Sequence, residues 1–396
     1  MKNKILAILI IPFLLCGCYN YTELEDVSIC TAMGFDIKDD GYEISYMVAN
    51  SRKTDASTKE GQSQAVVYTG NGKTVSEAIN SLTTTMPLIP YISHLETIII
   101  SDDVAQKGLL DILDYLLRNP ESRKKFKLVL TNNVKASDVL KVMSPLSSFP
   151  STNIASNIKS SSTFQSISIE FEYNQFIAYF LEEGINPILS SVTIMGDIEE
   201  SGKSESLNQT TMEALIVTST IGVFKDDKLV KFSSLEEDYG INFMRNKVKE
   251  MLLTFPCEDN FITLNIEKSK TKLDIKFENN KPIGIINIEA EAVLNELNCK
   301  IDIKNEENIK KMEEEGKKII EEYIDKAIKL AKNEKTDIYG FGTLIHKNYP
   351  KEWKILKNSW DETEFIKLEF EKNINLTING TGSLKQTLEE MKWVKK

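Results

Sequence analysis

The residue of this chain best placed to do chemistry is a thiol near its start. Cys18 directly follows Gly17 and stands three residues after Leu15. A small residue before a cysteine, with a leucine at that spacing, is typical of the cleavage site of a bacterial lipoprotein signal peptide. Cys16 offers a second thiol, but it lacks both of these neighbours. We therefore predict that the chain is cut after Gly17 and that a diacylglycerol is attached to the sulfur of Cys18.

The apolar segment before Cys18 is too short to cross a membrane as a helix. It runs from Ile5 to Leu15 after two lysines, and Pro12 interrupts it. A membrane-spanning helix needs about 20 apolar residues. The pattern therefore predicts a signal peptide over residues 1–17, which places the rest of the chain outside the cytoplasm, held to a membrane by its lipid.

The charge balance excludes one class of partner. The 396 residues carry a formal net charge of −11. An acidic surface repels nucleic acids and anionic lipid headgroups. We therefore expect no nucleic-acid partner, and we expect the membrane link to come from the acyl chains or from a protein. The length predicts two or three domains.

The remaining cysteines and the histidines do not predict a metal site. Cys30, Cys257 and Cys299 are far apart in the sequence, and the only two histidines, His94 and His346, stand alone. We expect the three cysteines to be small buried apolar residues. An extracytoplasmic location also permits a disulfide, and Cys257 with Cys299 is the pairing to test first.

Residues 18–205 are expected to form an N-terminal α/β domain, because strand-like and helix-like segments alternate there. The predicted strands are 44–49, 66–72, 95–100 and 126–130, and the predicted helices are 76–86, 105–117 and 136–143. Such alternation indicates a mixed sheet covered by helices. The serine-rich segment 144–168 predicts a long loop with one short helix.

The rest of the chain is expected to form two further domains. Residues 206–260 predict a small middle domain, with a hairpin over 214–232 and a helix over 235–251 that Gly240 weakens. Residues 261–396 predict a C-terminal α+β domain. Its elements are three antiparallel strands at 262–267, 272–278 and 284–292, a long amphipathic helix over 306–332 and a last strand over 367–378. The fold class is thus α+β, a three-domain lipoprotein with mixed and antiparallel sheets packed by helices.

No set of residues in the sequence predicts catalysis. Ser93, His94 and Glu96 are near neighbours at the start of a predicted strand, so their side chains point to different faces. Gly340-Phe341-Gly342 lacks the glycine spacing of a nucleotide site and predicts a tight turn. A group of aromatic residues could stack on a ligand, but is more typical of a small core: Tyr339, Phe341, Tyr349, Trp353 and Trp360. We expect no catalytic residue, no cofactor and no enzyme.

Two blocks of sequence resemble one family. The first is the run 19–26 with Gly34-Phe35-Asp36, and the second is 337–342 followed by 346–353 and 360–362. Shorter matches follow the same order at 93–96, 222–229 and 255–257. Together they resemble the Ger(x)C lipoproteins, the C subunits of nutrient germinant receptors in endospore-forming bacteria. Tyr19 stands where the family usually has tryptophan, which is a conservative aromatic change.

The resemblance implies a location and partners. It implies a three-domain α+β protein on the outer face of the inner spore membrane, assembled with an integral membrane A subunit and a transporter-like B subunit. It carries over no catalytic residue, and Cys18 is the only position whose role it transfers. Two other interpretations stay open from the sequence: a solute-binding lipoprotein of a transporter, and a surface-anchored hydrolase.

Overall fold

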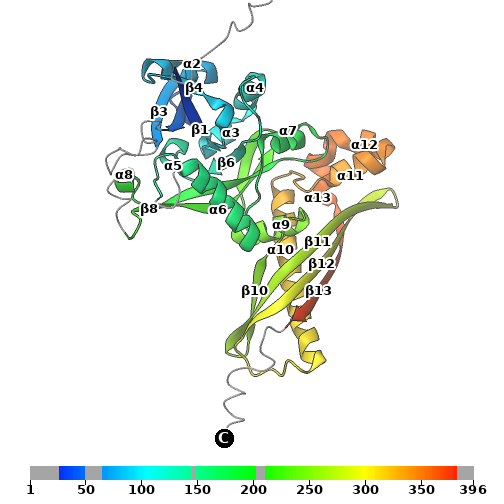
Figure 1. Ribbon diagram of the computed structural model, residues 1–396. Coiled ribbons are helices and arrows are strands. Elements are labelled where there is room, and N and C mark those ends of the chain that lie inside the picture. Colours follow the sequence, from blue (N-terminus) through cyan, green and yellow to red (C-terminus); the bar gives the residue numbers. More distant parts are fainter. Residues whose placement is uncertain (1–25, 50–64, 145–148, 202–209, 381–396) are drawn as a thin grey trace, which may run out of the picture.

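The computed structural model contains two β-sheets, each packed by helices (Figure 1). It describes residues 26–49, 65–144, 149–201 and 210–380. The predicted signal peptide and Cys18 lie outside these ranges. Helix and strand occur in both halves of the chain, which confirms the α+β class.

The first sheet is mixed, as predicted. Its strand order is β3-β2-β1-β5-β6-β7-β8-β9, with β4 paired to the start of β1. Its strands are β1 (Val27–Lys38), β2 (Gly41–Ala49), β3 (Ala65–Gly72), β4 (Ile89–Tyr91), β5 (Thr97–Ile100), β6 (Lys127–Thr131), β7 (Ile188–Gly196), β8 (Ala214–Lys225) and β9 (Lys228–Phe232). The central strands β1, β5, β6 and β7 run parallel, with long connections between them, whereas the strands on either side pair in antiparallel fashion.

Both faces of the first sheet are buried. Along β5, Ile98 and Ile100 contribute to one core and Ile99 to the other, because successive strand residues point to opposite faces. The first core is covered by α2 (Val75–Ser81), α3 (Asp102–Lys107), α4 (Leu110–Arg118) and α7 (Tyr173–Leu181). The second is covered by α5 (Ala136–Val139) and α6 (Pro150–Phe164), while the short α8 (Ile198–Ser201) follows β7.

Helix α6 corrects the prediction of a long loop over 144–168. Pro150 occupies the start of the helix, where its missing N–H costs nothing, and Ile154 and Ile158 face the core. The serine content was misleading because a helical serine can bond to its own backbone. The Ser161 hydroxyl donates to the carbonyl of Asn157 at 2.9 Å.

The second sheet contains β10 (Met251–Cys257), β11 (Asn260–Glu278), β12 (Lys281–Leu297) and β13 (Glu369–Gly380), in that order. One detail of the prediction is wrong. The first two predicted strands are one strand, β11, which continues through a bulge between Ile266 and Lys268. The last strand, β13, runs parallel to β12 because long helical segments separate the two in sequence.

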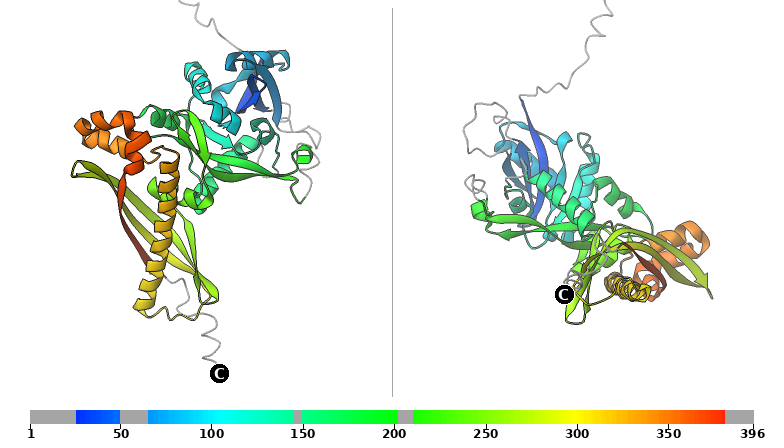
Figure 2. Two further views of the ribbon diagram at one scale, coloured as in Figure 1. Left: turned by 180° about the vertical axis from the view of Figure 1, so that it is seen from behind. Right: turned by 60° about the horizontal axis from the view of Figure 1, so that its bottom comes forward.

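The long predicted helix is confirmed as α10 (Glu306–Asn333), which lies along one face of the second sheet (Figure 2). Its buried residues include Met312, Ile320, Ile324 and Ala331. Three short helices precede β13: α11 (Phe341–Asn348), α12 (Pro350–Leu356) and α13 (Phe365–Lys367).

The segment 206–260, expected as a middle domain, contributes to both sheets. It supplies β8 and β9 to the first sheet and β10 to the second. Between them, α9 (Leu235–Met244) ends earlier than predicted and packs against α10. Gly240 permits this packing, because a Cβ there would lie 2.1 Å from the carbonyl oxygen of Tyr323. The three-domain boundaries stay a prediction.

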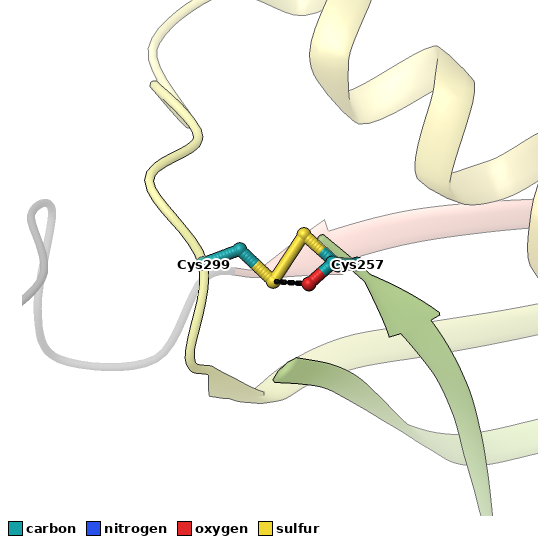
Figure 3. Close-up of a disulfide and its surroundings, with 2 residues drawn as sticks. All are labelled: Cys257 and Cys299. Atoms are coloured by element: carbon teal, nitrogen blue, oxygen red, sulfur yellow. Dashed lines mark hydrogen bonds between the residues drawn. A yellow bond between two sulfur atoms is a disulfide. The ribbon is translucent and has the colours of Figure 1, made fainter. Parts of the chain in front are cut away.

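The cysteines divide into a pair and a buried single residue. Cys257 ends β10 and is bonded to Cys299, which follows β12, with 6.2 Å between the two Cα atoms (Figure 3). The expectation of three unpaired cysteines is therefore wrong for these two, because the antiparallel β10 and β11 return the chain to the end of β12. Cys30 is unpaired and buried, and burial raises the pKa of its thiol. Within the described ranges, no helix is both long and apolar enough to cross a membrane.

Candidate functional site: the junction between the sheets

The three residues considered as a hydrolytic set do not assemble. The Ser93 hydroxyl donates to the backbone carbonyl of Glu121 at 2.9 Å, and the His94 ring is exposed beside Tyr91. The Glu96 carboxylate instead accepts bonds from two hydroxyl groups of α6. His346 is exposed at the end of α11. Over the described residues, no cluster of histidine, cysteine, aspartate or glutamate side chains could hold a metal ion.

The structure instead centres on the buried carboxylate of Asp337, just after α10. This carboxylate accepts hydrogen bonds from the backbone N–H groups of Tyr339 (3.0 Å), Gly340 (2.8 Å) and Gly342 (2.8 Å) and from the indole N–H of Trp360 (3.0 Å). Gly340 has a φ of 85°, a conformation that glycine adopts without a steric penalty. The predicted glycine turn is confirmed at Gly340, whereas Phe341 and Gly342 already belong to α11, and Asp337 is the residue that accepts the N–H groups of this segment.

Burial and hydrogen bonding act in opposite directions on Asp337. Burial raises the pKa of its carboxyl, and the hydrogen bonds that the carboxylate accepts from N–H groups lower it. The net result is a pKa of about 6. Each oxygen of the Asp337 carboxylate accepts two hydrogen bonds from the protein itself. The carboxylate therefore acts as a structural group and not as a ligand-binding one.

A second set of bonds ties this turn to the first sheet. The Asp361 carboxylate accepts from the backbone N–H of Asp337 and from the side-chain amide of Asn186, each at 3.0 Å. Asn186 precedes β7, and its amide oxygen accepts from the N–H of Asp226 at the β8–β9 turn, again at 3.0 Å. One asparagine therefore joins two connections of the first sheet to the C-terminal block.

The predicted aromatic cluster is mostly core. Trp353 is 3% exposed and Trp360 is 2% exposed, and their rings meet edge to face with 5.7 Å between centroids. The Trp353 indole donates to Glu183 at 2.7 Å and lowers the pKa of that carboxyl. Tyr339 and Phe341 are also buried, whereas Tyr349 is half-buried. Because both indole N–H groups already have protein acceptors, the core interpretation is confirmed over the ligand-stacking one.

Arg245, at the end of α9, adds a buried cation to the junction. Its guanidinium lies over the rings of Tyr179 and Phe171, at 4.6 and 5.6 Å from their centroids, and donates to the carbonyl of Ile338. Burial lowers its pKa. Its contacts with α7 and with the segment after α10 show that it holds two parts of the chain together.

Asp238, on α9, is a buried acid that the sequence did not indicate. One of its oxygens accepts from the Ile221 N–H at 3.1 Å and from the Ser233 hydroxyl. The other has no hydrogen-bond partner among the described residues. Burial raises the pKa of Asp238 to about 8, so the folded protein holds it largely as the neutral acid at pH 7. Asp238 lies in the acidic first turn of α9, after Glu236 and Glu237.

The fold and this junction define a class of α+β protein with two sheets. Hydrogen bonds of residues 337–361 connect the C-terminal part of the chain to the first sheet. Among the described residues, those considered for catalysis do not assemble. A family model described as the spore germination protein N-terminal domain matches residues 20–194. A second, described as spore germination B3/GerAC-like, C-terminal, matches residues 219–382. The chain therefore belongs to the Ger(x)C family of spore germination proteins.

Relatives of full length support this assignment. The chain is 21% identical over 388 residues to spore germination protein KC of Bacillus subtilis (strain 168), covering 96% of this chain and 94% of the relative. It is 24% identical over 385 residues to spore germination protein B3 of the same strain, covering 93% and 95%. The crystal structure of the GerBC protein has the same fold, with a TM-score of 0.56 and 20% identity over 88% of this chain and 98% of that chain.

Proposed function

We propose that this protein is the membrane-anchored, non-catalytic C subunit of a spore nutrient germinant receptor. It is held by a lipid on Cys18 at the outer face of the inner spore membrane, where it assembles with the A and B subunits. The observation that carries the proposal is the ordered match of both family models along the chain. The predicted lipoprotein cleavage site before Cys18 supports the anchor.

The junction supports a non-catalytic role. The buried Asp337 and the half-buried Asp361 use their carboxylate oxygens to accept hydrogen bonds from backbone and side-chain N–H groups of the protein itself. An active site needs polar groups directed at a substrate. Residues 337–361 thus hold the two sheets together, so that they meet the other subunits as one body.

The anchor is tested by changing Cys18 to alanine in the sporulating cell. We expect an uncleaved or detached product, loss of the protein from the inner membrane fraction, and loss of nutrient-triggered germination. The control is Cys16→Ala, which should leave both anchoring and germination unchanged. Wild-type membrane retention of the Cys18→Ala protein would contradict the lipid anchor. Normal germination of a strain lacking the gene, with no redundant receptor present, would contradict the receptor role.

A further inference from the structure

One side of the first sheet gathers exposed apolar side chains. Strands β1, β4, β5 and β6 are parallel, so they all begin on the same side, which we call the leading edge. There Ile89 is 59% exposed, Ile29 is 41% exposed and Tyr91 is 36% exposed. Ile29 is paired directly with Tyr91 in the β1–β4 ladder, so the three side chains belong to one short pair of strands. Apolar side chains that cluster on a surface mark an interaction site more often than single ones do.

Basic side chains lie next to this apolar group. The loop between α4 and β6 contains Arg123, Lys124 and Lys125 against one acidic residue, Glu121. Arg123 and Lys125 are exposed, while Lys124 donates to the carbonyl of Leu117 at 2.8 Å. The loop is joined to the leading edge through the bond from Ser93 to the Glu121 carbonyl. Within this loop basic side chains outnumber acidic ones in a chain whose net charge is −11, although the exposed Asp26 and Glu96 directly precede β1 and β5 at the same edge.

The length of chain before β1 limits what can meet the leading edge. Val27 begins β1 nine residues after Cys18. Nine residues span at most about 30 Å when fully extended. If Cys18 is acylated, the start of β1 therefore stays within that distance of the membrane surface. In Figure 1 the start of β1 and β4 lie at the top, while the free end of the second sheet lies at the bottom.

We propose that the leading edge docks on an anionic lipid bilayer, with Ile29, Ile89 and Tyr91 at the interface and Arg123 and Lys125 at the headgroups. This inference rests on the anchor of the proposed function and adds a second contact to it. Tyrosine favours the membrane interface, and basic side chains are attracted to anionic headgroups. A lipid together with a basic surface holds a protein more firmly than either one alone.

The test compares two positions of similar exposure, one on each sheet. Ile89→Cys and Leu252→Cys each place one accessible thiol for a fluorescent label; Leu252 is 54% exposed on β10. Residues 19–396 carry an N-terminal hexahistidine held by nickel-chelating lipid, so that docking is measured whether or not Cys18 is acylated in the cell. The vesicles contain phosphatidylcholine with or without phosphatidylglycerol, and a nitroxide-labelled lipid quenches a label that reaches the bilayer.

We expect the label at position 89 to be quenched severalfold more than the label at 252 on phosphatidylglycerol vesicles. Changing both Arg123 and Lys125 to glutamate should shift the equilibrium toward the undocked state by roughly tenfold or more. The same change at Lys304 and Lys310, two exposed lysines at the start of α10, is the control and should have no effect.

Equal quenching at positions 89 and 252 would overturn the docking. Shielding of position 89 in spore membranes but not on vesicles would also overturn it, because a protein would then cover the edge. The vesicle result does not depend on acylation of Cys18, which the Cys18→Ala fractionation tests separately. The failure of the docking and the failure of the anchor can therefore be told apart.

Discussion

The junction between the sheets and the leading edge use their side chains in opposite ways. At the junction, polar groups such as Asp337 are buried and bonded to the protein itself. At the leading edge, apolar groups such as Ile89 are exposed. The buried polar groups of the junction stabilise the fold. The exposed apolar groups of the leading edge leave a surface that a binding partner can cover. The comparison indicates that the polar groups of residues 337–361 stabilise the fold, whereas the surface proposed for docking lies on another part of the molecule.

The largest expected effect comes from breaking the junction. Trp353→Ala removes a buried ring and the donor to Glu183, and should lower the free energy of unfolding by about 3–5 kcal/mol. Trp353→Phe, which keeps an aromatic ring, should cost less. Thermal and denaturant unfolding measure both. A melting temperature unchanged by Trp353→Ala would make this ring part of a binding surface and would break the comparison.

The disulfide gives the next largest effect, at the end of the second sheet far from the junction. Replacing both Cys257 and Cys299 by serine should cost about 2–4 kcal/mol, because the bond closes a segment of 42 residues in the unfolded chain. Cys30→Ser, in a buried but unpaired position, is the comparison variant. Labelling of free thiols in the unfolded, unreduced protein should detect Cys30 and neither of the paired residues. Three free thiols would show that the pair is not formed.

A pH dependence distinguishes the buried acid of α9 from ordinary surface carboxylates. The pKa of Asp238 rises from 3.8 to about 8 on folding. Between these values the folded state binds more protons than the unfolded state, so stability falls as the pH rises and levels off above about 8. From pH 6 to pH 8 the loss should be about 2 kcal/mol. Denaturant unfolding at several pH values measures it.

Asp238→Asn should remove most of this slope, because the amide does not titrate. The same substitution at the exposed Asp103 should leave the slope unchanged. A slope of equal size in the Asp238→Asn protein would assign the pH dependence to other groups of the junction.

The smallest effect on stability is expected at the leading edge. Reversing the charges of Arg123 and Lys125 should change the free energy of unfolding by less than about 0.5 kcal/mol, since both side chains are exposed. A decrease of several kcal/mol in the free energy of unfolding would show that Arg123 and Lys125 stabilise the fold. The leading edge would then not differ from the junction in this respect.

Elements with a clear period were predictable from the sequence, and residues defined by tertiary contacts were not. The stripe along 306–332 located α10 within one residue, although Ile320 and Ile324, which are buried, were not assigned to it. The one short helix predicted within 144–168 is the longer α6, whose length the serine content concealed because a helical serine hydroxyl can bond to the backbone of its own helix. Asp337 was visible only as part of a glycine turn, because its four donors are brought together by the fold.

The most direct test of the central claim is purification of the tagged protein from the membranes of dormant spores. If the protein is the C subunit of a germinant receptor, the A and B subunits encoded with it should co-purify after mild detergent extraction, and the Cys18→Ala protein should recover neither. Recovery of the wild-type protein alone, or with the components of a solute transporter, would contradict the account.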